Sequence, residues 1–200
     1  MAKHTILITS AVYSNYGIYK PEERIKQTLE TAKSARKYIP DSTIILIDNS
    51  TTQVQEDNSP EFEELIDTVD YYIDNSDDPD IKHFHDNVTN YDIGKNVMEV
   101  LGLLKSLTYF TTDENIMKDI NASSRIFKLS GRYLVTDKFD ITKFDNKDTK
   151  DKYVFKQRQP GWIQNVDVTH LLQTRLYSFT PAMLQAVSYT HLTLPTILLV

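Results

Sequence analysis

The sequence contains no cysteine, which excludes disulfide bonds and metal sites built from thiolates. Basic side chains are also few, since 22 Lys and Arg against 28 Asp and Glu give a net charge of -6. A general nucleic-acid binder needs a basic surface, so that class is not expected. The chain lacks both a signal-peptide core and an apolar run near the roughly 18 residues that predict a membrane span. We therefore expect a cytoplasmic protein without a membrane span, in which any anionic ligand meets a local cluster of cations.

The segment 187–200 differs in composition from the rest, because it carries no Lys, Arg, Asp or Glu. Its stretch Val187–Thr196 resembles the translation of an adaptor used in transposase-based sequencing libraries. The alternative is a natural apolar C-terminal strand. Under the adaptor interpretation, residues 1–186 form one domain that is incomplete at its C-terminus, and 187–200 are an artefact.

Short apolar runs alternate with helical patterns along the chain. The runs over 5–9 and 43–48 are typical of strands buried on both faces of a parallel sheet. Between them, Pro21 and the two glutamates that follow it predict the start of a helix. Further helices are expected to begin near Ser59 and Asp92, and further strands over 70–73, 124–135, 153–157 and 175–179. The alternation predicts an α/β fold that is doubly wound, with a mostly parallel sheet flanked by helices.

Polar residues follow the second apolar run, where open α/β sheets bind their ligands. Asp48 ends that run and precedes Asn49, Ser50 and Thr51. Its carboxylate is suited to accept a hydrogen bond from a ribose hydroxyl or a base N–H, and should then be exposed. The alternative is an Asx turn, in which the carboxylate accepts the backbone N–H of Ser50.

The expected helix near Asp92 begins Asp92-Ile93-Gly94-Lys95. Glycine at the second helical position leaves the free backbone N–H groups open to a phosphate, and Lys95 adds positive charge. An ordinary surface helix start is the alternative.

The stretch Arg125–Tyr133 concentrates positive charge in an acidic chain. If it is one strand, Lys128, Ser130 and Arg132 share a face. Two cations on one face of a central strand are costly to bury unless an anion meets them. The pattern therefore predicts an anionic ligand, and the alternative is an edge strand with a solvated lysine and arginine.

Four segments carry a resemblance to a known family. Asp48–Thr51 is similar to the Asp-x-Ser-Thr strand end of nucleotide-sugar glycosyltransferases of the GT-A fold. The start of the Asp92 helix is similar to the helix start that follows their nucleotide site. Lys128–Tyr133 and Thr174–Phe179 resemble segments of bacterial and viral polysaccharide-synthesis glycosyltransferases. The resemblance spans roughly residues 6–179 and implies transfer of a sugar from a nucleotide-sugar to a saccharide acceptor in glycan synthesis.

The resemblance also implies roles for individual residues. The first strand and its loop, with Ser10 and Tyr13, would hold the nucleoside together with Asp48 and Asn49. Lys128 and Arg132 would stabilise the leaving diphosphate, beside Ser130 and Lys95. Arg175 and Tyr177 would face the same cleft.

The chain departs from the family where metal-dependent members carry Asp-x-Asp, because Asp137 and Asp140 are three positions apart. These two residues are the best candidates for a catalytic base or for a ligand of Mg or Mn, whose use is left open. Two alternatives to the transferase remain. One is a nucleotide-binding module without turnover, and the other is a metallohydrolase using His83 and His85.

Overall fold

The computed structural model describes residues 4–15, 17–51, 59–89, 91–155, 158–160, 170–172 and 175–184. The segment 187–200 lies outside these residues, so its adaptor origin stays a prediction.

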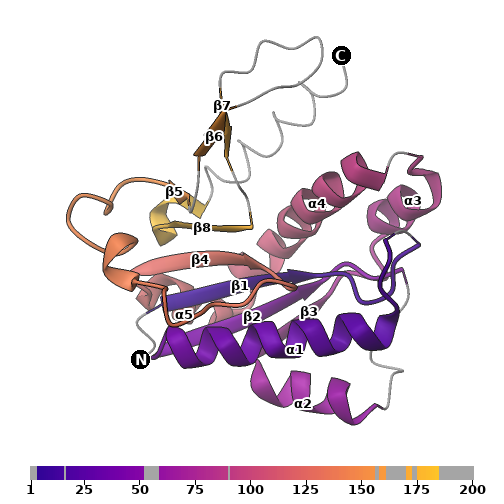
Figure 1. Ribbon diagram of the computed structural model, residues 1–200, viewed down its shortest axis with the longest axis horizontal. Coiled ribbons are helices and arrows are strands. Elements are labelled where there is room, and N and C mark those ends of the chain that lie inside the picture. Colours follow the sequence, from indigo (N-terminus) through magenta and orange to yellow (C-terminus); the bar gives the residue numbers. More distant parts are fainter. Residues whose placement is uncertain are drawn as a thin grey trace.

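Six strands form one mixed sheet with the order β3-β2-β1-β4-β8-β5 (Figure 1). Four of them are parallel: β1 (His4–Ser10), β2 (Ser42–Asp48), β3 (Tyr71–Asp74) and β4 (Arg125–Ser130). The other two complete the edge, and β8 (Leu176–Phe179) runs antiparallel to both β4 and β5 (Val154–Phe155). A separate antiparallel ribbon pairs β6 (Arg158–Pro160) with β7 (His170–Leu172). The predicted α/β fold with a mostly parallel sheet is confirmed.

Helices cover both faces of the sheet (Figure 1). One face carries α1 (Pro21–Tyr38), against which α2 (Pro60–Thr68) packs. The other face carries α4 (Tyr91–Thr112) and α5 (Glu114–Ala122), and α3 (Pro79–Asn87) packs on α4. Proline occupies the start of α1, α2 and α3, where its missing N–H costs no hydrogen bond.

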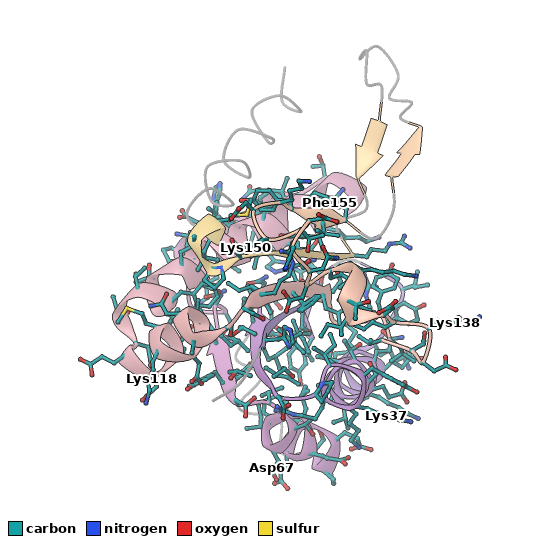
Figure 2. All side chains as sticks on the ribbon, turned by 90° about the vertical axis from the view of Figure 1, so that its left-hand side faces the viewer. Lys37, Asp67, Lys118, Lys138, Lys150 and Phe155 are labelled. Atoms are coloured by element: carbon teal, nitrogen blue, oxygen red, sulfur yellow. The ribbon has the colours of Figure 1, made fainter. Side chains whose placement is uncertain are left out.

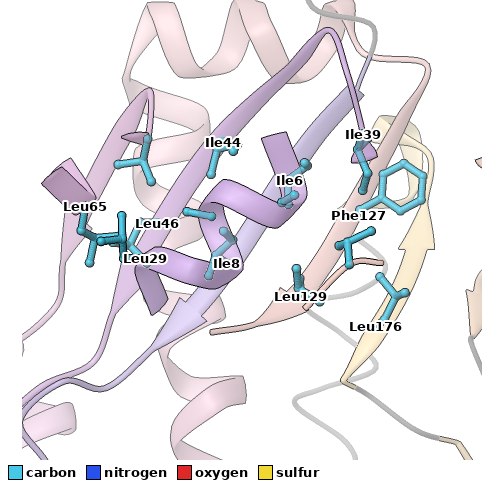
Figure 3. Close-up of a cluster of buried hydrophobic side chains, with 14 of the residues drawn as sticks. Ile6, Ile8, Leu29, Ile39, Ile44, Leu46, Leu65, Phe127, Leu129 and Leu176 are labelled. Carbon is cyan, nitrogen blue, oxygen red and sulfur yellow. The ribbon is translucent and has the colours of Figure 1, made fainter. Parts of the chain in front are cut away.

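The core has two layers, because alternate residues of each central strand point to opposite faces. Between the sheet and α1 lie residues such as Ile6, Ile8, Phe127 and Leu129 (Figure 3). Between the sheet and α4 with α5 lie Leu7, Ile45, Ile126 and others. Many charged side chains point outward, as Figure 2 shows for Lys37, Asp67 and Lys118, although some, such as Lys128 and Arg125, are buried. Continuous apolar runs therefore predicted strands buried on both faces correctly.

The fourth strand is shorter than predicted, since β4 ends at Ser130 and not at 135. The next residues form a turn in which the N–H groups of Arg132 and Tyr133 donate to the Ser130 carbonyl. Gly131 allows this turn to lie against β1, because a Cβ there would be only 3.0 Å from the Thr9 carbonyl oxygen. The prediction that Lys128 and Arg132 share one face of a strand is therefore wrong.

Candidate functional site

The sheet order reverses direction beside β1. The chain moves from β1 outward to β2 and β3, then crosses back to place β4 on the other side of β1. At such a switch point, the loops that follow the two neighbouring strands leave in opposite directions. Open α/β sheets bind ligands in the crevice between these loops, at the carboxyl edge of the sheet. Here the edge, on the right in Figure 1, is formed by the residues after Ser10, Asp48, Asp74 and Ser130.

Asp48 lies at this edge, but its side chain is buried. Its Oδ1 accepts the backbone N–H of Ser50 at 3.0 Å and also the Ser50 hydroxyl, and its Oδ2 accepts the N–H of Val12 at 3.2 Å. Burial raises the pKa of the Asp48 carboxyl, while the hydrogen bonds oppose that shift. The geometry is that of the Asx turn and not of an exposed ligand, so Asp48 holds the loops after β1 and β2 together.

Ser10 is the last residue of β1 and Tyr13 lies in the loop that Asp48 organises, and both are half-buried. The Ser10 hydroxyl lies 3.3 Å from that of Thr28, and the Tyr13 backbone N–H donates to the Ser50 hydroxyl at 2.9 Å. Both residues thus lie at the carboxyl edge, where the sequence placed them.

Asn49 is buried between β2, β3 and α4. Its Oδ1 accepts from Asn75 Nδ2 at 2.9 Å, and its carbonyl oxygen lies 2.8 Å from Nε2 of His85. The helix approaches so closely that a Cβ at Gly102 would lie 2.0 Å from Asn49 Nδ2. Asn49 therefore joins elements of the scaffold and does not reach the surface.

Lys128 is also buried, with only 1% of its side chain exposed, and its partner is an anion of the chain itself. Its ammonium group pairs with Oε1 of Glu99 from α4 and donates to the Ser130 hydroxyl at 2.9 Å. The hydroxyl groups of Thr9 and Ser130 donate to the same Oε1, each at 2.8 Å. Burial lowers the pKa of the Lys128 ammonium. The sequence predicted an anionic ligand for Lys128, but the anion that pairs with it in the structure is Glu99 of the chain itself.

Arg132 and Arg175 are the exposed cations of the edge. The guanidinium of Arg132 lies 5.8 Å from the ring centre of Tyr19, in the loop after β1. That of Arg175, at the start of β8, lies 4.7 Å from the ring centre of Tyr133. The Ser130 N–H donates to the Arg175 carbonyl at 3.0 Å, so both arginines flank the turn after β4. Stacking on tyrosine orients each guanidinium and leaves its charge facing outward.

Lys95 and Tyr177 have different surroundings. Lys95 is exposed in the second turn of α4, about one helical turn before Glu99 and so at the same end of the sheet. Tyr177 is buried on β8, where its ring lies 5.9 Å from Lys128 Nζ and stacks on Phe179. Burial raises the pKa of Tyr177. Lys95 thus lies at the surface, whereas Tyr177 belongs to the core.

The structure does not bring Asp137 and Asp140 to the carboxyl edge. After the β4 turn the chain runs back along α1, where the Val135 N–H donates to the Ser34 hydroxyl. Asp140 then caps the short helix η2 (Ile141–Lys143), and Asp145 just beyond it bonds to His4 at the start of β1. With β1 seven residues long, this amino edge lies about 20 Å from the carboxyl edge.

Asp137 and Asp140 are exposed, and the carboxylate of Asp140 accepts from the N–H and hydroxyl of Thr142. These bonds lower the pKa of Asp140. A helix cap explains Asp140 fully, so neither residue joins the other predicted site residues.

A metal site receives no set of ligands from the part of the chain that the structure describes. No group of three His, Asp or Glu side chains converges there. His83 and His85 lie two positions apart on α3, which places them about 200° apart around the helix. His83 is exposed, whereas His85 is buried and burial lowers its pKa. The two imidazoles therefore cannot share one ion, which removes the basis of the metallohydrolase alternative.

Glu99 is the site residue that the sequence did not single out. The signal was present, because a lone glutamate stands between Val97-Met98 and Val100-Leu101 on the apolar part of a helix. A charged residue in such a position requires a partner, which only the fold identifies.

Comparison with known proteins does not extend this picture. No protein-family model matches the sequence, and no curated protein matches it significantly. Among the described residues, no helix is long and apolar enough to cross a membrane.

Proposed function

We propose that this domain is a GT-A-type glycosyltransferase, which binds a nucleotide-sugar at the carboxyl edge between β1 and β4 and transfers the sugar to a saccharide acceptor. The observation that carries the proposal is the pair of exposed arginines, Arg132 and Arg175, beside the switch point of a mostly parallel sheet. Segments around both arginines also carry the sequence resemblance to glycan-synthesis transferases.

The arginines are suited to the diphosphate. A guanidinium group remains charged and binds two phosphate oxygens at once, whereas the Lys128 ammonium is already engaged by Glu99. We therefore assign the binding of the diphosphate, which the sequence suggested for Lys128, to Arg175 together with Arg132. As the sugar is transferred, negative charge develops on the leaving diphosphate, and oriented cations stabilise it.

The nucleoside is expected in the loop after β1, which the Asx turn at Asp48 shapes. Val12 and Tyr13 are fixed there by hydrogen bonds to Asp48 and Ser50. Asp48 thus contributes by preorganising the loop and not by contacting the ligand. Electrostatic stabilisation by arginine requires no Mg or Mn, and we assign no residue to either ion.

Calorimetric titration with UDP, GDP and CDP tests the proposal. Arg132→Ala and Arg175→Ala should each weaken binding of the preferred nucleotide about tenfold, the effect of one lost charged hydrogen bond. The loss should shrink as salt is added, because the contacts are exposed.

The control is Lys37→Ala. Lys37 is also an exposed cation, 5.0 Å from the ring centre of Tyr38, but it lies in the last turn of α1, whereas Tyr19 beside Arg132 precedes the first turn. The Lys37→Ala substitution should leave the affinity for the nucleotide unchanged. Equal affinity of wild type, both arginine variants and the control would refute the site.

A binding module without turnover remains the second candidate, because Asp137 and Asp140 lie at the amino edge and not beside the arginines. Slow release of free sugar from a bound nucleotide-sugar distinguishes the two candidates, because a transferase should show it and a binding module should not. Nucleotide binding without any hydrolysis or transfer would favour the module.

A further inference from the structure

Glu99 presents one carboxylate oxygen that the protein does not use. Its Oε1 takes all three bonds, from Lys128, Thr9 and Ser130. Among the described residues none bonds to Oε2, and 22% of the Glu99 side chain is exposed. The carboxylate is therefore held rigidly by one oxygen while the other remains available.

The position of this oxygen is at the switch point. Thr9 and Ser130 are the penultimate residue of β1 and the last residue of β4, so their common partner lies level with the carboxyl edge. Arg132 follows two residues after Ser130 in the same turn. Glu99 is therefore bonded to the residue at which the turn carrying Arg132 begins.

The chemistry of the Glu99 Oε2 atom limits which ligand groups can bind to it. A carboxylate only accepts hydrogen bonds, which excludes phosphate as its partner. The adjacent Lys128 ammonium disfavours a metal cation. A hydroxyl donor remains, and charge makes such a bond stronger than a neutral one.

We propose that Glu99 accepts a hydrogen bond from a hydroxyl of the transferred sugar. The proposed function assigns the nucleoside to the loop after β1 and the diphosphate to the arginines, which leaves the transferred sugar as the hydroxyl-bearing group without an assigned partner. This inference rests on the proposed function and adds a residue that selects the donor sugar.

The test must not leave Lys128 buried without a counter-charge. We therefore compare Lys128→Met, which keeps the carboxylate, with the double variant Lys128→Met/Glu99→Gln, which loses it. Both are titrated with UDP-glucose and GDP-mannose and with UDP and GDP. The control pair is Lys33→Met and Lys33→Met/Glu64→Gln, which dismantles an exposed ion pair between α1 and α2.

Relative to Lys128→Met, the double variant should bind the preferred nucleotide-sugar about tenfold more weakly, while its affinity for the matching nucleoside diphosphate changes less than about twofold. The control pair should show no difference. Equal binding of the nucleotide-sugar by both variants, or an equal loss for the nucleoside diphosphate, would overturn the role of Glu99 and leave the proposed function standing. Failure of wild type to bind any of the four nucleotides would overturn the proposed function and this inference with it.

Discussion

Removing the charge of Glu99 should destabilise the protein strongly, because the buried Lys128 would lose the carboxylate with which its ammonium group pairs. Breaking a buried ion pair by removing one partner costs about 3–5 kcal/mol. The lower end applies here, since Glu99 is partly exposed and the amide oxygen of Glu99→Gln still accepts a hydrogen bond. In a chain of this size, a loss of about 3 kcal/mol lowers the melting temperature by roughly 6–12 °C.

The double variant Lys128→Met/Glu99→Gln should recover most of this loss. Replacing both members of a buried pair with uncharged groups is often neutral, so we expect stability within about 1 kcal/mol of wild type. Urea unfolding followed by far-UV circular dichroism measures all the variants and yields the coupling energy between the two positions. Additive effects of the two substitutions would refute the ion pair.

The deficit of Glu99→Gln should also depend on pH. Burial lowers the pKa of Lys128, and loss of the Glu99 carboxylate removes the charge that opposes this shift. Between the lowered folded-state pKa and the unfolded value of about 10.4, the unfolded chain binds a proton that the native protein does not. Stability must therefore rise with pH across that window, more steeply in Glu99→Gln than in wild type. A deficit that stays constant from about pH 7 to about pH 9.5 would contradict a buried lysine whose charge the Glu99 carboxylate stabilises.

Two further predictions concern the carboxyl edge. Gly102→Ala should lower the free energy of unfolding by about 1–3 kcal/mol, because the new methyl group would overlap the amide of Asn49. Thermal or urea unfolding measures the change. A gain in stability from higher helix propensity would show that α4 lies further from β2. Asp48→Asn keeps an acceptor for the Ser50 N–H but turns its amide group toward the donor N–H of Val12. We therefore expect the free energy of unfolding to fall by about 1–3 kcal/mol. Unchanged stability would indicate that Asp48 does not bind the Val12 N–H.

The sequence predicted the elements whose signals are local. Continuous apolar runs identified β1 and β2, and Pro21 with its two glutamates identified the start of α1. The end of β4 was missed because it depends on a distant contact. Gly131 turns where its N–H donates to the Thr9 carbonyl, and nothing near Gly131 in the sequence encodes that meeting.

The candidate site was predicted in part for the same reason. Loops at the carboxyl ends of parallel strands necessarily meet, so Ser10, Asp48 and Arg132 lie at one edge as expected. Whether each side chain is exposed could not be predicted, because it depends on helices that are distant in the sequence. The partner of Lys128 lies on α4, 29 positions away, and the loop that carries Asp140 runs back to the other edge of the sheet.

The fold separates two tasks that the sequence had combined. Internal hydrogen bonds engage the side chains of Lys128, Asp48 and Asn49. A polar group that is already hydrogen-bonded within the protein gains little from a ligand. Their contribution is to hold the edge rigid, which reduces the entropy that a ligand must lose on binding. In the function proposed above, the ligand would be recognised by atoms that the scaffold orients, namely the guanidinium groups of Arg132 and Arg175 and the Oε2 atom of Glu99. Because these atoms offer positive charge and a hydrogen-bond acceptor, a ligand that combines phosphate with sugar hydroxyls fits them better than either group alone.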